Sequence, residues 1–180
     1  MTATMRFTIL GCGASQGSPR VGLGWGVSDP LEPKNRRLRC SLLVENISEN
    51  GRTQVLVDTG PDVREQLIGQ HITHLDGVIY THEHADHTHG IDELRGYFLN
   101  QKKRIPVWVD SSTGGMLMTR FGYCVTQATG SDYPPILDLK NIVSGRLVHS
   151  DGAGGVISGL PFDVQHGSIQ ALGFRVGGVA

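Results

Sequence analysis

The sequence lacks the features that mark several classes of protein. Its cysteines are Cys12, Cys40 and Cys124, which are widely separated and form no CxxC pair. This spacing predicts neither a disulfide framework nor a thiolate zinc site. Every apolar run falls short of the ~20 residues that a membrane-spanning helix needs, and the first residues do not show the pattern of a signal peptide. We therefore expect a cytoplasmic protein with no membrane partner.

An excess of charge of either sign is also lacking. The 16 lysines and arginines are balanced by 17 aspartates and glutamates, which gives a net charge of −1. Because proteins that bind nucleic acid through its backbone carry a basic surface, we expect no strong nucleic-acid patch. The 180 residues, of which 38% are hydrophobic and 25 are glycine, are enough to bury a core. They predict one domain, residues 1–180, with short strands and tight turns.

Apolar patterning predicts a mixed α+β chain. Helices are expected at residues 63–68, from 91 to about 104, and from Ser111 or Ser112 to about Phe121. A polar hairpin loop is expected at residues 46–53. Strands are expected at 6–10, 40–45, 54–58, 77–80, 105–109, 142–149, 162–165 and 172–176.

Metal-binding residue types gather in residues 81–90. Four of these ten residues are histidine and one is aspartate, against eight histidines in the whole chain. Imidazole nitrogens and carboxylate oxygens are ligands that Zn²⁺ selects. His82 and His84 lie two apart in an extended segment, so their side chains point to one side, whereas Asp86 and His87 are adjacent and cannot share that direction. The stretch therefore predicts two neighbouring metal sites, the first begun by His82 and His84 and the second by Asp86 and His87.

The spacing of residues 82–90, His-x-His-x-Asp-His-x-x-Gly, resembles the metal motif of the metallo-β-lactamase fold hydrolases. The resemblance implies two divalent ions, zinc or manganese, and implies that Asp86 is the catalytic residue as well as a ligand. Asp58 stands in a Val-Asp-Thr-Gly run that is similar to the Asp-x-Gly turn of the family. The resemblance implies that this aspartate braces the metal loop from behind the ligands.

A third ligand for the first ion is implied by a later segment. His166 stands in a Val-Gln-His-Gly run that is similar to the segment with the strand-end histidine that completes the three-histidine set of the family. The resemblance thus implies that His82, His84 and His166 hold one ion. His149, which also lies in a predicted strand, is the competing candidate.

Two further runs, residues 10–19 and 37–44, resemble the phosphodiesterase branch of the family, which includes phosphoribosyl cyclic phosphate phosphodiesterase and ribonuclease Z. This implies hydrolysis of a small nucleotide-like or cyclic phosphate ester by a metal-activated hydroxide. Arg37, Arg39 and Arg95 are the candidates for contacting phosphate. A solvated surface is the other interpretation of the basic run that contains the first two.

Other functions remain open at this point. They are tRNA processing of the ribonuclease Z type, hydrolysis of a thioester or lactam, and metal binding without catalysis by a truncated remnant. A homodimer is compatible with each of them.

The family fold is a four-layer αββα sandwich built from two similar halves. Its second half supplies a bridging aspartate and a final histidine beyond the strand that carries the residue corresponding to His166. The 180 residues correspond to the first part of such a domain. We therefore expect a domain that is incomplete at its C-terminus, with part of the second half missing. In it Asp86 and His87 alone serve the second ion, and the last strand is an exposed edge.

Overall fold

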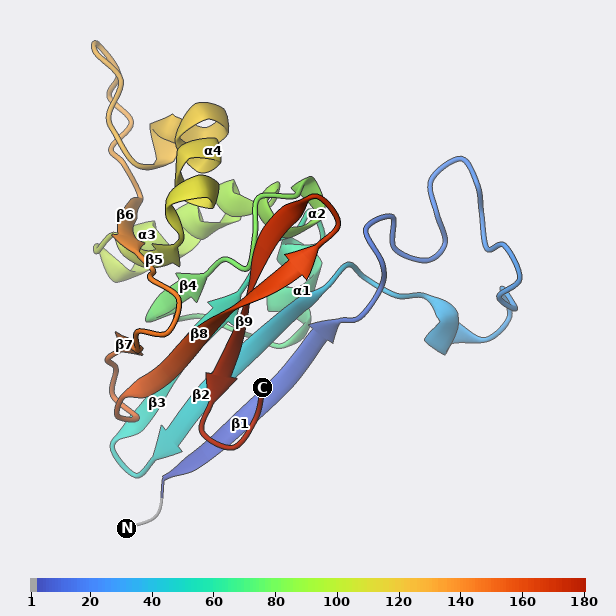
Figure 1. Cartoon of the computed structure of the whole chain (residues 1–180), viewed down its shortest axis with the longest axis horizontal. Coiled ribbons are helices and arrows are strands. Elements are labelled where there is room, and N and C mark those ends of the chain that lie inside the picture. Colours follow the sequence, from blue (N-terminus) through green and yellow to red (C-terminus); the bar gives the residue numbers. More distant parts are fainter. Residues whose placement is uncertain (1–2) are drawn as a thin grey trace.

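Two β-sheets packed face to face organise the chain (Figure 1). The structure is a computed structural model that describes residues 3–180. The larger sheet has the strand order β1-β2-β3-β4-β5-β6, and the smaller has the order β7-β8-β9. The strands are β1 (Thr4–Gly11), β2 (Ser41–Ser48), β3 (Gly51–Val57), β4 (Gly77–Ile79), β5 (Ile105–Val109), β6 (Leu137–Asn141), β7 (Val148–Ser150), β8 (Ile157–His166) and β9 (Ile169–Val176).

Helices cover the face of the larger sheet that points away from the smaller one (Figure 1). The helices are α1 (Val63–Gly69), α2 (Ala85–Thr88), α3 (Leu94–Gln101) and α4 (Ser111–Phe121), with 3₁₀ turns η1 (Pro33–Asn35), η2 (Ile91–Glu93) and η3 (Gly122–Cys124). Across residues 3–180, no helix combines the length and the hydropathy needed to cross a membrane.

Alternate residues of the central strands pack into two separate hydrophobic cores. Leu43 and Leu56 point to the helices, whereas their neighbours Val44 and Val55 point to the smaller sheet. Successive side chains of a strand point to opposite faces, so a central strand of a sandwich is apolar on both sides. The burial of both faces explains why β2 and β3 are nearly continuous apolar runs.

The strand directions determine which chain segments meet at one edge of the larger sheet. β3, β4, β5 and β6 are mutually parallel, so the segments that leave β3 and β4 emerge at the same edge of the sheet. The hairpin formed by β8 and β9 reaches this edge from the other sheet, where its tip lies beside α2 (Figure 1). There the backbone N–H of Leu172 donates to the carbonyl of Thr81 at 2.8 Å. Three chain segments that are distant in sequence thus converge.

Most predicted elements are present, but the prediction of a strand at residues 142–149 is wrong. The chain forms β6 before this range and β7 at its end, and residues 142–147 lie in neither strand. Gly145 has a φ of 78° and its N–H donates to Pro161, which turns the chain there. Leu137, fully buried in β6, pairs with Ile105 of β5 instead.

The predicted hairpin loop at residues 46–53 is also wrong, because β2 and β3 extend through it and leave only residues 49–50 as the turn. Two of its polar residues, Asn46 and Thr53, are buried, and a remote loop supplies hydrogen-bond partners for them. The Asn46 amide donates to the carbonyl of Val156 at 3.2 Å, and the Thr53 hydroxyl donates to that of Gly155 at 2.6 Å.

Two element boundaries are corrected as well. The predicted cap of α4 at Ser111 or Ser112 is wrong, because the Asp110 carboxylate caps the helix by accepting from the N–H of Thr113 at 2.9 Å. The strand predicted at 162–165 is longer, since β8 begins at Ile157 and includes Pro161.

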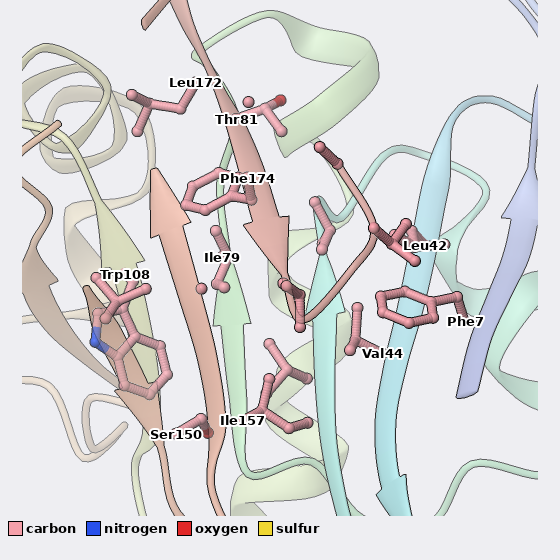
Figure 2. A pocket seen from close by; sticks show the side chains of 18 of the residues that line it. Phe7, Leu42, Val44, Ile79, Thr81, Trp108, Ser150, Ile157, Leu172 and Phe174 are labelled. Carbon is pink, nitrogen blue, oxygen red and sulfur yellow. The ribbon is translucent and has the colours of Figure 1, made fainter. Parts of the chain in front are cut away.

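In the described residues 3–180, the chain forms three layers of the predicted sandwich: the helices, the larger sheet and the smaller sheet. The predicted fold class is thus confirmed. β9 is an edge strand, as predicted. An apolar cavity of about 220 Å³ remains between the two sheets, lined by core side chains such as Val44, Ile157 and Phe174 (Figure 2). Side chains therefore do not completely fill the space between the two sheets.

Candidate metal centre

Asp58 joins the two segments that leave β3 and β4. It is 2% exposed, its N–H donates to the carbonyl of Ile79, and its φ is 62°. Aspartate is one of the few residues that tolerate this left-handed conformation. Its carboxylate accepts from the N–H and the hydroxyl of Thr81, both at 2.8 Å, and lies 2.6 Å from Nδ1 of His87. These contacts fix the start of the histidine stretch and one imidazole within it.

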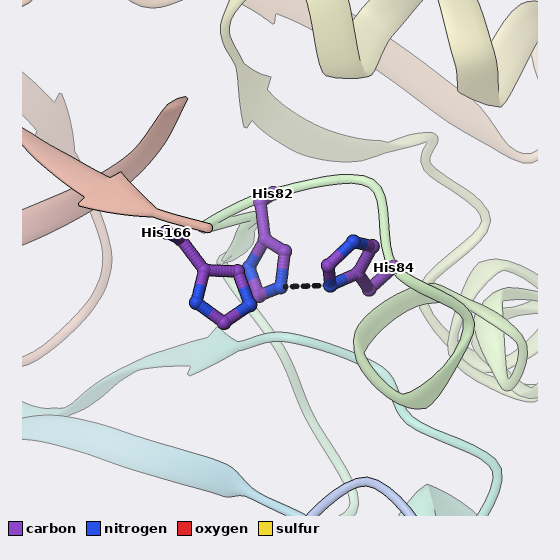
Figure 3. Close-up of side chains that lie close together, drawn as sticks. All are labelled: His82, His84 and His166. Atoms are coloured by element: carbon purple, nitrogen blue, oxygen red, sulfur yellow. Dashed lines mark hydrogen bonds between the residues drawn. The ribbon is translucent and has the colours of Figure 1, made fainter. Parts of the chain in front are cut away.

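Three histidines meet where the hairpin tip reaches this edge (Figure 3). His82 follows β4, His84 precedes α2, and His166 ends β8. Their ring nitrogens lie within 4.8 Å of one another, and Nε2 of His82 is 3.1 Å from Nδ1 of His84. The competing residue His149 lies on β7, where its Nδ1 is 2.8 Å from the Ser158 hydroxyl. The structure therefore brings His166, and not His149, to His82 and His84.

The chemistry of these donors fits a divalent ion. Burial, helped by the nearby His87, lowers the pKa of His82 to about 4, so this imidazole is neutral at pH 7. Neutral imidazole is the form that binds metal. The Thr81 hydroxyl lies 2.9 Å from Nδ1 of His82, which leaves Nε2 directed at His84. A hydrogen-bonded second nitrogen of this kind is usual for a metal-binding histidine.

Asp86 and His87, both on α2, form a second donor pair beside the first. Oδ2 of Asp86 is 3.4 Å from Nε2 of His87, and the rings of His82 and His87 have centroids 4.1 Å apart. Burial acts to lower the pKa of His87, but the hydrogen bond to Asp58 and the charges of Asp58 and Asp86 more than offset it, so this pKa is raised. The two donor groups are thus neighbours, in the arrangement predicted from the sequence spacing.

Backbone packing holds the turn after β3 against the histidine stretch. The N–H of Thr59 donates to the carbonyl of His87, and the N–H of Gly90 donates to the carbonyl of Thr59, both at 2.8 Å. A Cβ on Gly60 would lie 2.2 Å from the carbonyl oxygen of Asp86, and one on Gly90 would lie 2.3 Å from that of Gly60. Both positions therefore require glycine because of the close approach of two backbones.

Replacing Gly90 by alanine is expected to lower the free energy of unfolding by about 1–3 kcal/mol, the usual cost of overpacking. The new methyl group would also meet a side-chain carbon of Val63 at 2.5 Å. Urea denaturation measures the change. Gly96→Ala is the matched control, since a Cβ there has open space within α3 and should stabilise the protein by about 1 kcal/mol. Equal stability of the two variants would contradict the close approach.

The three arginines predicted to contact phosphate lie in different surroundings. The Arg39 guanidinium is held by the Asp62 carboxylate in a two-pronged ion pair. Arg95, on α3, donates to Asp92 at 3.0 Å and lies over the ring of Tyr133. Arg37 is exposed, and its Nη1 lies 3.1 Å from the sulfur of Cys12. Of these side chains, Arg37 has no carboxylate partner within the described part of the chain.

Two residues that support the site were not found from the sequence. Thr81 stands next to the histidine motif, and its place at a strand end was the one signal for it. Arg120, near the end of α4, donates from Nη1 to the carbonyl of Glu83 at 2.6 Å. No sequence pattern connects that helix to the histidine stretch.

Comparisons with known proteins place the chain among metallo-β-lactamase folds. A protein of Porphyromonas gingivalis (strain ATCC BAA-308 / W83) named octanoyltransferase is 30% identical over 178 residues, which are 98% of this chain and 34% of that protein. The chain therefore spans about a third of the length of this curated relative.

Among solved structures, a diphosphatase from the PhnP family has 29% sequence identity and a TM-score of 0.80, over 98% of this chain and 63% of that one. The Zn²⁺-bound PqqB of Methylobacterium extorquens has 17% identity and a TM-score of 0.65, over 97% of this chain and 62% of that one. At this identity PqqB supports the fold alone. In both cases the chain spans just under two thirds of the solved protein.

A family model described as the beta-lactamase superfamily domain matches residues 53–179. That match begins within β3, continues through β9 and includes every histidine and aspartate of the two donor groups. Since it spans well over half of the sequence, the chain belongs to the beta-lactamase superfamily.

Proposed function

We propose that this chain carries the metal-binding part of a metal-dependent hydrolase. The reaction is cleavage of a phosphodiester in a small nucleotide-like or cyclic phosphate ester. The observation that supports this proposal most directly is the convergence of His82, His84 and His166 beside the pair formed by Asp86 and His87. The likeness to a diphosphatase of the PhnP family supports a phosphate ester over other substrates.

The residues fit two adjacent divalent ions, zinc or manganese. His82, His84 and His166 would hold the first, and Asp86 with His87 would contribute to the second. A divalent ion, when bound, supplies Lewis acidity to a phosphoryl oxygen and makes water more acidic. Soft thiolate donors are not part of either group, which suits a borderline or hard ion.

The protein side chains have separate tasks in this proposal. Asp86 lies at the start of α2 with its side chain only partly covered, so its Oδ2 can accept a proton from attacking water. The Asp58 side chain is buried away from solvent. It positions His87 and Thr81 and takes no part in proton transfer.

The other substrates considered receive less support. A tRNA-processing enzyme needs a basic surface to grip its substrate, and the net charge of −1 provides no such field. The name octanoyltransferase belongs to a protein of which only about a third matches this chain. A thioester or lactam substrate uses the same metal ligands, so turnover must distinguish it from a phosphodiester.

Metal loading followed by turnover tests the proposal. Purified chain, stripped with a chelator and reloaded with Zn²⁺ or Mn²⁺, should hydrolyse bis(p-nitrophenyl) phosphate, and renewed chelation should abolish the activity. Bound metal is counted by mass spectrometry of the elements. Cleavage of a thioester or a lactam without cleavage of the phosphodiester would overturn the choice of substrate.

A metal-binding module without catalysis is the second candidate. Within residues 3–180, the group of three or more metal-binding side chains is His82, His84 and His166, and the second pair has no third partner of this kind. Tight binding of one ion per chain, with no turnover of any of these substrates, would favour this candidate over the hydrolase.

A further inference from the structure

The apolar cavity between the two sheets belongs to neither metal-binding group (Figure 2). Its volume is about 220 Å³, and its walls are mostly core side chains of β2, β3, β8 and β9, among them Val44 and Ile157. In other proteins, an apolar cavity of about 150 Å³ stays free of water and binds benzene. Scaled from that example, this cavity has room for a molecule of about six to nine carbon atoms.

Ser150, on β7, places a hydroxyl group in this apolar wall. Its neighbour Val148 packs against the core between the sheets, and residues two apart in a strand point to the same face. Ser150 also pairs with Ile157 of β8, which belongs to that core. The Ser150 side chain therefore faces the cavity, where Figure 2 shows it at the end opposite Thr81.

The Ser150 hydroxyl has no hydrogen-bond partner among residues 3–180. The residue is 4% exposed, and its Oγ is buried and unpaired. Thr81 differs, because its hydroxyl donates to Asp58 at 2.8 Å and lies 2.9 Å from Nδ1 of His82. One hydroxyl holds a water molecule poorly, since buried waters make about three hydrogen bonds. A ligand that pairs with the Ser150 hydroxyl therefore satisfies a buried polar group that the fold leaves unpaired.

The wall of the cavity carries no formal charge. Among the described residues that line it there is no aspartate, glutamate, lysine or arginine. The titratable residue in the wall is His149, whose Nδ1 lies 2.8 Å from the hydroxyl of Ser158. An ionised carboxylate or amine would lose its hydration in the cavity without gaining a partner of opposite charge. The wall therefore suits a neutral ligand.

The cavity can be entered from solvent and is separated from the metal centre. Val179 lines its margin and is 48% exposed, so a ligand can enter there. Thr81 stands between the cavity and the histidines, because its side chain lines the cavity while its hydroxyl contacts Asp58 and His82. Occupation of the cavity therefore requires no metal.

We propose that this cavity binds a neutral, medium-chain aliphatic molecule that carries one hydroxyl or carbonyl group. The chain packs between the sheets against side chains such as Val44 and Phe174, and the polar group forms a hydrogen bond with the Ser150 hydroxyl. Burial of the methylene groups supplies the affinity, and the hydrogen bond fixes which end of the ligand lies deepest. The site does not depend on the proposed hydrolase function, since none of its residues is a proposed metal ligand.

Isothermal titration of the full chain with 1-hexanol, in the presence of a chelator, tests the site. Saturable binding of one molecule per chain is expected. Ser150→Ala should weaken this binding about tenfold through the loss of one buried hydrogen bond, and should leave the affinity for benzene unchanged. Ser158→Ala is the matched control, because this serine pairs with His149 and does not line the cavity. It should change neither affinity.

Thermal denaturation gives a second readout. The Ser150 hydroxyl has no partner to lose, so Ser150→Ala should fold. Because a ligand that binds the folded state raises Tm, 1-hexanol should raise Tm more for the wild type than for this variant.

Several results would overturn the proposal. They are the absence of saturable binding of 1-hexanol and benzene, equal weakening by the two serine variants, and binding of hexanoate as tight as that of 1-hexanol. A chain that sediments as a dimer and binds neither ligand would assign the cavity to a second copy instead. Failure of the metal-loaded protein to hydrolyse a phosphodiester would refute the proposed function and leave these outcomes unaffected.

Discussion

Replacing His84 by alanine is expected to lower the affinity for Zn²⁺ by more than about 100-fold. Loss of a partner behind the ligands typically costs 10–100-fold, and His84 is placed among the ligands themselves. Its Nδ1 lies 3.1 Å from Nε2 of His82, and both rings face His166. With one imidazole gone, two nitrogens remain for an ion that prefers four ligands.

His84 is a better choice for this test than His82, because its removal does little to the fold. The side chain is exposed and makes no capping hydrogen bond at the start of α2. His82 is 5% exposed and contacts Thr81, so its replacement would also create a cavity. Loss of binding in the His84 variant can therefore be assigned to the ligand.

Competition with a chromophoric chelator measures the affinity. His89→Ala is the matched control, since this exposed histidine of the same stretch faces the ring of Phe121 instead. His166→Ala should weaken binding as His84→Ala does, whereas His149→Ala should not. An unchanged affinity in the His84 variant, or the same loss in the His89 variant, would refute the three-histidine site.

The proximity of His82, His84, Asp86 and His87 could be predicted from the sequence because these candidate ligands are close together in the chain. The two-residue spacing of His82 and His84 fixes their common direction as long as the segment is extended. The break between them and Asp86 follows from the turn into α2. His166 is different, since no local pattern ties the end of β8 to the end of β4. It was predicted through the family resemblance, and its contact depends on how the two sheets pack.

Where sequence reasoning failed, a remote partner decides the local structure. Asn46 and Thr53 are polar and predicted a loop, but inside β2 and β3 their side chains donate hydrogen bonds to the carbonyls of Val156 and Gly155. The backbone pairing of Ser18 with Arg37 is of the same kind, because the two residues lie far apart in an irregular stretch.

Replacing Asp58 by asparagine is expected to lower the affinity for Zn²⁺ by about 10–100-fold, with all ligands still present. The carboxylate accepts three hydrogen bonds, two from Thr81 and one that joins it to His87. An asparagine keeps the left-handed backbone and the volume, but its NH₂ group cannot accept, so a buried donor is left without a partner. That loss should also reduce the free energy of unfolding of the metal-free protein by about 1–3 kcal/mol.

The stability loss should depend on pH because Asp58 raises the pKa of His87. A histidine whose pKa is raised on folding stabilises the folded state below its unfolded pKa of about 6.5, and this contribution disappears as the pH rises through the folded pKa. Asp58→Asn removes it, so the gap in stability between wild type and variant should be wider at about pH 6 than at about pH 9, above the usual range for histidine. Urea denaturation of metal-free protein at the two pH values measures this gap, with Asp138→Asn, at an exposed ion pair with Lys140, as the control. A gap that is constant with pH would show that Asp58 supports the loop through Thr81 alone and leaves the charge of His87 untouched.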